Sequence, residues 1–291
     1  MREFSYAAPT TLAEAARLVA GAGGRAKILA GGTDILVQLR EGLREADLVV
    51  DVKKIPELAE LSYSREQGLR LGASVPCYRI YDHQEIVQAY SALVDAAKII
   101  GGWQIQSRAS VGGNLCNASP AGDTIPALIA HGVACVVVGP NGSRELPAAE
   151  FCVAPGRNAL QPGEILVTLV FPPPAARASS AYERFIPRNE MDIAVAGAGS
   201  WLQLSTDGSQ IEAARVAVCA IAPTPKFAAE ASAWLAGQPA TEATFAQAGE
   251  LAKKVAAPIT DMRGTAEYRT HLVGVLVKRT LAKAAQRARA L

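Results

Sequence analysis

The chain has 291 residues, which is enough for two or three compact units rather than one average domain. Half of the residues are hydrophobic and 19% are charged, which excludes a disordered chain. The formal net charge is +2, with 29 basic and 27 acidic residues, and only 5% of the residues are aromatic. This balance argues against nucleic acid as the main partner.

The amino-terminal residues carry charge with no apolar run behind it, so we expect no signal peptide. No segment is apolar for long enough to span a bilayer, and we therefore expect a cytoplasmic protein without membrane insertion. The cysteines form no Cys-x-x-Cys pair, which predicts reduced thiols and no iron–sulfur or zinc site on this chain. They are Cys77, Cys116, Cys135, Cys152 and Cys219.

The first half of the chain predicts alternating helices and strands. Thr11-Leu12-Ala13-Glu14 is a capping box, and the alanine-rich segment after it predicts a helix to Ala20. Buried strands are predicted at Lys27–Ala30 and Leu48–Val52. A further strand is expected at 68–75 and helical structure at 81–100. Residues 101–123 are rich in Gly, Ser, Asn and Pro and predict a long irregular, functional loop.

The second half begins with strands at 134–138 and 165–170, followed by a proline-rich linker at 171–174. Beyond it, strands are predicted around Tyr182, at 194–204 and at 211–221, the last two joined across Asp207-Gly208. Alanine-rich helices fill the remainder, and a basic last helix is predicted from Lys278 to Leu291. A solvated face is the favoured interpretation of its charge, and docking of an acidic partner is the alternative. We predict two domains, 1–174 and 175–291, the second being α+β with a three-stranded antiparallel sheet and helices.

One glycine pattern is misleading. Gly21-Ala22-Gly23-Gly24-Arg25-Ala26 matches the dinucleotide pattern G-x-G-x-x-G/A. That pattern works between a strand and a following helix, whereas here it follows a helix and precedes a strand. We therefore interpret it as the end of a helix, where glycines adopt the left-handed backbone conformation.

Two other glycine turns have a context that fits a ligand. Gly31-Gly32-Thr33-Asp34 follows a buried strand and precedes a helical turn, so its N–H groups can converge on an anion, although an ordinary strand–helix turn fits equally well. Ser110, Gly112, Gly113 and Asn114 again offer backbone donors without bulk, and Asn117, Ser119 and Asp123 suit a polyol. A surface loop is the alternative. Two such turns on one domain predict a long ligand with a central diphosphate, hence a dinucleotide of unspecified kind.

Ala30–Asp34 and Ala109–Asn114 together resemble the paired glycine motifs of the FAD-binding medium subunit of the xanthine dehydrogenase and carbon monoxide dehydrogenase family, the molybdenum hydroxylases. Ala118–Asp123 matches a run seen in xanthine dehydrogenases, and the resemblance covers the whole chain, including Gly163–Leu166 and Arg184–Asp192. It implies an FAD domain of the para-cresol methylhydroxylase type, built of two α/β subdomains, followed by the α+β domain.

The resemblance also implies which residues hold the cofactor. Those expected along the pyrophosphate and adenosine are Ile28, Leu29, Ala30, Gly31, Gly32, Thr33, Asp34 and Ile35. Those expected on the other side of the diphosphate are Ser110, Val111, Gly112, Gly113 and Asn114. Asp123 would bond the ribityl chain or the adjacent sugar, Ile100 and Leu166 would pack on the flavin, and Arg184 stands near the flavin edge where many relatives have lysine. Bulky residues at Gly32 or Gly113 are each expected to prevent cofactor binding while the chain stays folded.

By this resemblance the chain is an electron-transfer oxidoreductase subunit that contacts no organic substrate and has no catalytic or metal-binding residues of its own. Molybdopterin is expected on a large partner subunit and 2Fe–2S clusters on a small one, in a dimer of heterotrimers. Neither glycine motif contains His or Cys, so we expect non-covalent FAD, and the absence of a cysteine quartet argues against the branch that reduces aromatic thioesters. The substrate and the terminal acceptor (NAD, quinone or oxygen) stay open.

Two alternatives remain at this point: a self-sufficient FAD oxidoreductase of the same fold, and a scaffold that has lost its flavin. The first lacks a convincing acid or base in the second domain, and the intact glycine pairs argue against the second. His83, His131 and His271 have no nucleophile spacing around them and are interpreted as structural or exposed. Trp103 and Tyr182 are expected to pack in the core or at an interface.

Overall fold

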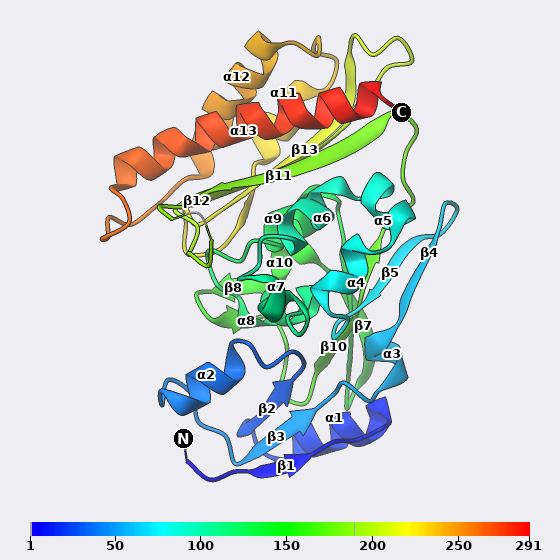
Figure 1. Ribbon diagram of the computed structural model, residues 1–291, viewed down its shortest axis with the longest axis vertical. Coiled ribbons are helices and arrows are strands. Elements are labelled where there is room, and N and C mark those ends of the chain that lie inside the picture. Colours follow the sequence, from blue (N-terminus) through cyan, green and yellow to red (C-terminus); the bar gives the residue numbers. More distant parts are fainter. Residues whose placement is uncertain (1, 189) are drawn as a thin grey trace.

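The computed structural model describes residues 2–188 and 190–291, so position 189 of the segment Arg184–Asp192 lies outside the described residues. Three layers follow one another along the long axis (Figure 1). They are a small parallel sheet, a larger antiparallel sheet with helices, and a second antiparallel sheet covered by helices. The predicted α+β class is confirmed.

The first layer is a parallel sheet with strand order β1-β3-β2. The capping box is confirmed, because the Thr11 hydroxyl accepts a hydrogen bond from the Glu14 N–H at 3.3 Å. Gly23 and Gly24 have φ of +57° and +85° between the first helix and β2, so the misleading glycine run is a helix stop as predicted. The elements are β1 (Ser5–Ala7), α1 (Leu12–Gly21), β2 (Ala26–Leu29), α2 (Ile35–Arg40) and β3 (Leu48–Asp51).

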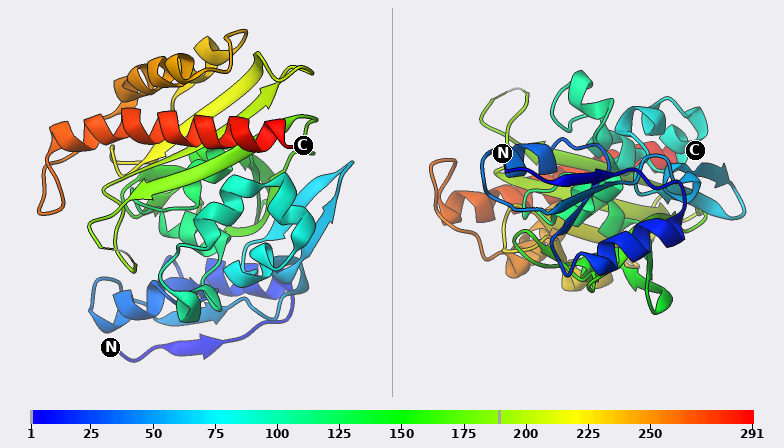
Figure 2. Two further views of the ribbon diagram at one scale, coloured as in Figure 1. Left: turned by 45° about the horizontal axis from the view of Figure 1, so that its top comes forward. Right: turned by 90° about the horizontal axis from the view of Figure 1, so that it is seen from below.

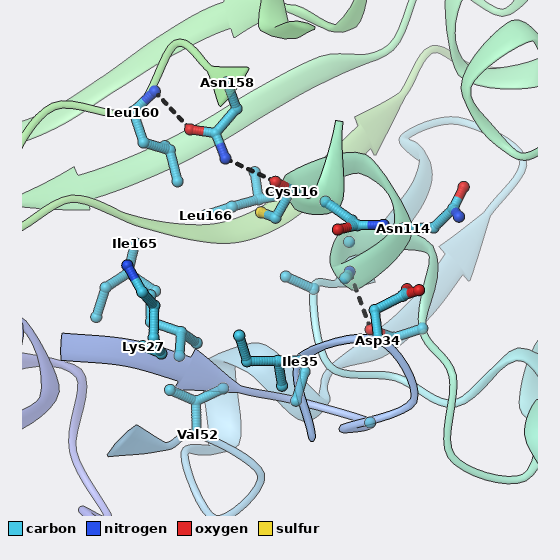
Figure 3. A pocket seen from close by; sticks show the side chains of 18 of the residues that line it. Lys27, Asp34, Ile35, Val52, Asn114, Cys116, Asn158, Leu160, Ile165 and Leu166 are labelled. Carbon is cyan, nitrogen blue, oxygen red and sulfur yellow. Dashed lines mark hydrogen bonds between the residues drawn. The ribbon is translucent and has the colours of Figure 1, made fainter. Parts of the chain in front are cut away.

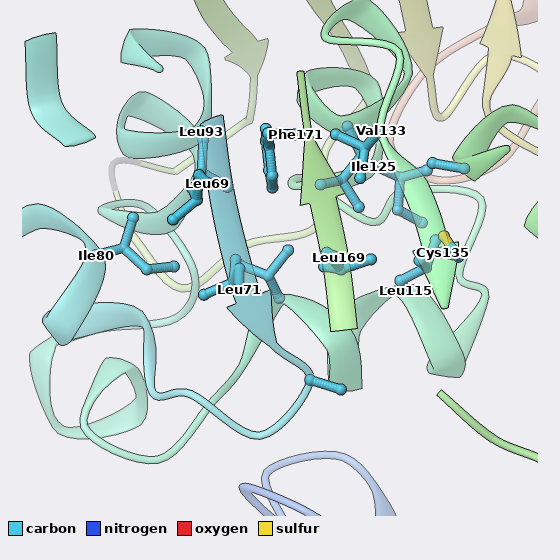
Figure 4. Packing of buried hydrophobic residues seen from close by; sticks show 14 of the residues in the cluster. Leu69, Leu71, Ile80, Leu93, Leu115, Ile125, Val133, Cys135, Leu169 and Phe171 are labelled. Atoms are coloured by element: carbon cyan, nitrogen blue, oxygen red, sulfur yellow. The ribbon is translucent and has the colours of Figure 1, made fainter. Parts of the chain in front are cut away.

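The second layer is an antiparallel sheet with order β4-β5-β10-β6-β7. Its central strand β10 is almost wholly apolar, which fits its burial between the helices and the first layer. Leu71, Leu169 and Cys135 from three neighbouring strands meet in its core (Figure 4). The elements are α3 (Pro56–Ala59), β4 (Leu61–Ser64), β5 (Gly68–Gly72), α4 (Cys77–Tyr81), α5 (Gln84–Ala89), α6 (Ser91–Ala97), α7 (Trp103–Gln106), α8 (Val111–Asn117), α9 (Ile125–Ala130), β6 (Ala134–Gly139), β7 (Gly142–Pro147), α10 (Ala148–Phe151), β8 (Cys152–Ala154), β9 (Arg157–Asn158) and β10 (Ile165–Phe171).

Two predictions for this layer were wrong in detail. The helical stretch at 81–100 is broken into short helices, because Tyr90 leaves the helical conformation at φ −129° and donates its buried hydroxyl to the Pro172 carbonyl at 2.8 Å. The irregular stretch at 101–123 contains α7 and α8, and the glycines that hide helical periodicity in the sequence form the first turn of α8. Ser110 caps that turn, accepting from the Gly113 N–H at 3.0 Å.

The third layer contains the three predicted antiparallel strands, to which a two-residue fourth strand is added. Gly208, at φ +72°, turns the chain between β12 and β13 as predicted. The last helix begins at Ala266, well before the predicted start, behind a Thr265 cap. The elements are β11 (Ala178–Phe185), β12 (Ala196–Leu204), β13 (Ile211–Cys219), β14 (Lys226–Phe227), α11 (Ala229–Leu235), α12 (Glu242–Ala252), the 3-10 helix η1 (Lys253–Val255) and α13 (Ala266–Arg289).

The second and third layers are joined by ion pairs from the last helix. Both Asp95 oxygens on α6 accept from Arg287 on α13, at 2.8 and 2.9 Å, and the Tyr182 N–H adds a further bond. Lys283 of α13 also approaches Asp95. The basic face of α13 is therefore partly committed to this junction, and the interpretation as a simply solvated face was wrong for Arg287. Figure 2 shows α13 lying along β11. The predicted boundary after residue 174 falls between β10 and β11 and stays a prediction.

No helix within the described ranges is both long and apolar enough to cross a membrane. Nor do the residues placed by the structure include a group of three or more His, Cys, Asp or Glu arranged to hold a metal ion. All five cysteines are free thiols.

Candidate functional site

A cavity of about 480 Å³ lies between the first two layers, in the size range typical of small-molecule sites (Figure 3). Its walls include β2, the turn that follows β2, the beginning of α8 and the first residues of β10. Most of the residues predicted to hold the cofactor line this cavity. They are Ile28, Ala30, Gly31, Gly32, Thr33, Asp34, Ile35, Ile100, Ser110, Gly112, Gly113, Asn114 and Leu166.

The two glycine turns touch each other. A Cβ on Gly31 would overlap the backbone carbonyl of Arg108, immediately before the second motif. Gly31 is therefore needed for the contact between the turns, rather than for the approach of a ligand. Segments that lie far apart in the sequence are thus brought together by backbone-to-backbone packing.

The remaining glycines of the motifs have different physical roles. Gly32 has φ +81°, a conformation that side chains rarely adopt. A Cβ on Gly112 would lie 2.5 Å from the Ala73 backbone, so Gly112 lets α8 pack against the strand layer. A Cβ on Gly113 would meet only the Ser110 hydroxyl, at 3.0 Å, and would otherwise stand in open space. Gly113 is the glycine that leaves room in the cavity.

Backbone donors from both turns are free at this cavity. Across the described chain, the N–H groups of residues 31–35 donate no hydrogen bond, nor do those of Val111 and Gly112 at the start of α8. Successive free N–H groups in a turn form a concavity that binds anions. A diphosphate fits this donor set, and the apolar side chains of Ile100 and Leu166 suit flat rings. The residues present therefore fit FAD.

Polar side chains fix the walls of the cavity. The Asn114 side-chain oxygen accepts from the Thr124 hydroxyl at 2.7 Å, which leaves its amide NH₂ group available. Gln38 of α2 donates to the Asn117 side chain of α8 at 3.0 Å and ties the two layers together across the cavity. Asn158 donates to the Cys116 carbonyl at 2.8 Å (Figure 3).

Four of the predicted cofactor residues do not line the cavity. Leu29 packs beside Leu39 in a small core cluster, and Val111 is buried in the core of the second layer. Asp123 and Arg184 lie together at the junction of the second and third layers. Their roles toward a cofactor stay predictions.

Asp123 and Arg184 form a buried ion pair with Tyr182. The Arg184 guanidinium donates to Asp123 Oδ2 at 2.5 Å and to the Ile99 carbonyl at 2.9 Å, next to the cavity-lining Ile100. The Tyr182 hydroxyl donates to Asp123 Oδ1 at 2.8 Å. Burial raises the pKa of Asp123, while Arg184 and Tyr182 oppose that shift. Tyr182 is buried, as predicted.

Sequence reasoning missed several cavity residues, including Lys27, Gln38, Arg44, Cys116 and Asn158. None belongs to a motif with a recognised spacing. Lys27 carried the one available signal, because a lysine is unusual inside a strand that the sequence predicts to be buried. Cys116 lines the cavity, and burial raises the pKa of its thiol to about 12. The thiolate is therefore scarce near neutral pH.

None of the three histidines lines this cavity. His131 is buried, its Nε2 lies 3.0 Å from the Ser180 hydroxyl, and burial lowers its pKa to about 3, so it is a neutral core residue. His83 is half-buried and His271 is exposed on α13, inside the helix it was expected to precede. Trp103 is 86% exposed, which excludes packing in the core of this chain, while packing at an interface stays a prediction.

Comparison with known proteins gives consistent matches over nearly the whole chain. Residues 2–174 match the FAD binding domain in molybdopterin dehydrogenase, and residues 180–284 match the CO dehydrogenase flavoprotein C-terminal domain. A putative xanthine dehydrogenase FAD-binding subunit of Escherichia coli K12 is 31% identical, covering 96% of this chain and 95% of the relative. The carbon monoxide dehydrogenase medium chain of Hydrogenophaga pseudoflava is 30% identical, covering 96% of each chain. A chain of reconstituted CO dehydrogenase from Oligotropha carboxidovorans superposes with a TM-score of 0.93 at 28% identity, over 98% of this chain and 99% of that chain.

Proposed function

Since the chain belongs to the FAD-binding medium subunits of the xanthine dehydrogenase and carbon monoxide dehydrogenase family, we propose that it passes electrons through one non-covalent FAD inside a larger dehydrogenase complex. The observation that carries this proposal is the pair of glycine turns, which touch each other and expose free N–H groups to one cavity. When bound, FAD supplies the ability to exchange electrons singly or in pairs.

The side chains and backbone of this chain would position the cofactor and exclude water. The free N–H groups of residues 31–35 and of Val111 and Gly112 would hold the diphosphate from two sides. Ile100 and Leu166 would cover apolar rings. Arg184, paired with Asp123 and bonded to the Ile99 carbonyl, would hold the chain beside Ile100 at the flavin end, and the carboxylate of Asp123 would offset its charge there.

The partners would be a large subunit with molybdopterin and a small subunit with 2Fe–2S clusters, assembled as a dimer of heterotrimers. The organic substrate would be oxidised on the large subunit. Electrons would then reach this chain from the small subunit and leave it for an external acceptor. The relatives named as medium chains and FAD-binding subunits support this assignment.

The proposal is tested by isolating the chain alone and, separately, by isolating it with its native partners from its host. The isolated chain should take up FAD in a one-to-one ratio, release it on acid denaturation, and oxidise no aldehyde or purine. The native complex should contain molybdenum, iron and FAD in a fixed ratio. An isolated chain that oxidises such compounds by itself would instead support a self-sufficient enzyme, and one that takes up no flavin would support a scaffold.

A further inference from the structure

The first layer is joined to the second in different ways on its two sides, with α1 and α3 on one side and α2 on the other (Figure 1). On the side of α1 and α3, apolar residues of the first layer share a buried core with Ile165 and Val167 of β10. On the side of α2, the core cluster consists of residues from the first layer itself: Phe4, Leu29, Ile35, Leu39, Ala46 and Val49. In the part of the chain that the structure describes, the hydrogen bonds from α2 and the loop after it to the second layer come from Gln38 and Arg44.

Gln38 and Arg44 are held together as a pair of donors. Gln38 Nε2 donates to the Asn117 side-chain oxygen at 3.0 Å, and Arg44 Nη2 donates to the Gly156 carbonyl at 2.8 Å. The backbone N–H of Arg44 also donates to the Gln38 carbonyl at 3.2 Å, at the end of α2. All four residues line the cavity. The two donors therefore reach the second layer from one fixed segment of the first.

The two acceptors are joined to each other in a similar way. α8 ends at Asn117, and the next residue, Ala118, has a φ of +49°, which residues with a side chain rarely adopt. The Ala118 carbonyl accepts from the Gly156 N–H at 3.0 Å, which fixes the β8–β9 hairpin to the end of α8. Gly156 has a φ of +68°, and a Cβ there would lie only 3.2 Å from Arg44 Nη2. The end of α8 and the hairpin therefore form one edge that receives Gln38 and Arg44.

We propose that Gln38 and Arg44, with Asn117 and Gly156 as their acceptors, form a latch that must open before FAD can enter or leave the cavity. The latch rests on the proposed function and adds to it the control of cofactor exchange. Its contacts lie within this chain and require no contact with FAD. Breaking two hydrogen bonds whose groups can then bind water costs less than exposing a buried apolar core. The α2 side is therefore the side on which the two layers separate.

A latch differs from a residue that holds the bound cofactor in its effect on rates. A residue that contacts bound FAD slows its release and leaves its association rate unchanged. A latch is closed both before and after binding, so it slows both steps and changes the dissociation constant little. In Gln38→Met, the association and dissociation rates of FAD should both rise about three- to tenfold, because one neutral hydrogen bond is lost. Stopped-flow flavin fluorescence measures both rates on the full chain.

Cys116 gives a second readout that needs no cofactor, because its thiol lines the cavity behind the latch. In the apo chain, alkylation of Cys116 by the neutral reagent N-ethylmaleimide should also become about three- to tenfold faster in Gln38→Met. It should become faster still in the double variant Gln38→Met with Arg44→Met. Peptide mass spectrometry separates Cys116 from the other cysteines. Cys77 and Cys219, which are buried away from the cavity, should be alkylated at the wild-type rate.

Arg40→Met is the matched control, because Arg40 lies on the same helix, pairs with Glu41 and does not line the cavity. It should change neither the FAD rates nor the alkylation of Cys116. Unchanged alkylation of Cys116 in the double variant would refute the latch, and so would equal acceleration at Cys77 and Cys219, which reports general unfolding. Faster release of FAD without faster association would also refute it and make Gln38 a residue that holds the bound cofactor. If wild type binds no FAD, the proposed function fails, and the alkylation rates alone decide whether the latch exists.

Discussion

Replacing Gly113 by valine is expected to abolish FAD binding in a chain that remains folded. The new side chain would start from a Cβ whose only close neighbour is the Ser110 hydroxyl, and it would fill space in the cavity. Gly113 stands in the first turn of α8, where its φ is not positive, so the backbone accepts a side chain. Helix propensity differs little between glycine and valine, by less than about 1 kcal/mol. We expect a loss of FAD affinity of about a hundredfold or more, equivalent to about 3 kcal/mol, measured by equilibrium titration.

A matched control is available for this variant. Gly21→Val adds the same side chain at a helical glycine with open space around it, outside the cavity, and should leave FAD affinity unchanged. Gly113→Ala should give an intermediate loss. Tight FAD binding by a folded Gly113→Val chain would show that the cofactor does not approach α8.

The other glycines of the motifs do not give an equally clear test. Gly32 has a positive φ, and Gly31 and Gly112 contact other backbone segments, so side chains there disturb the turns themselves. A bulky residue at Gly32 is therefore expected to strain the turn, and not to leave the chain intact as the sequence suggested. Loss of FAD in a Gly32 variant could then come either from a blocked cavity or from a distorted turn.

Asp123→Leu is expected to destabilise the apo protein by about 3–5 kcal/mol, because it leaves the Arg184 guanidinium buried without its counter-charge. The Tyr182 hydroxyl loses its acceptor in the same variant. The double variant Asp123→Leu with Arg184→Met removes both charges, and it should recover most of the lost stability. Urea unfolding of the FAD-free proteins measures these free energies.

The apo state is essential to this comparison. If Asp123 acted only on the cofactor, Asp123→Leu would weaken FAD binding without changing the unfolding free energy of the apo chain. That result would contradict the structural role assigned to the Asp123–Arg184–Tyr182 cluster. Arg184→Lys provides a further comparison, since the lysine keeps the charge but cannot donate to Asp123 and the Ile99 carbonyl with the same planar geometry.

The sequence predicted the strands of the sheets best where apolar runs are long and bounded by turns. β10 and the β12–β13 hairpin lie close to their expected positions, because burial on both faces or a tight turn leaves a strong local signal. α8 was missed, because its first turn is built of glycines whose helical conformation is fixed by the Ser110 cap and by packing on Ala73. Such tertiary contacts leave no periodic pattern in the sequence.

The site, too, could be predicted where the signal is local and could not where it depends on tertiary packing. The two glycine turns could be identified from composition and context, and the structure places both at one cavity. Their contact through Gly31 and Arg108 could not be predicted, because it depends on how distant segments pack.

Amide hydrogen exchange of the apo chain with and without FAD tests the central claim most directly, because it reports on the N–H groups themselves. Addition of saturating FAD should slow exchange in the segments 31–35 and 110–114 together, and ADP should protect both more weakly. Protection of one segment alone, or of neither, would contradict a diphosphate site shared by the two turns.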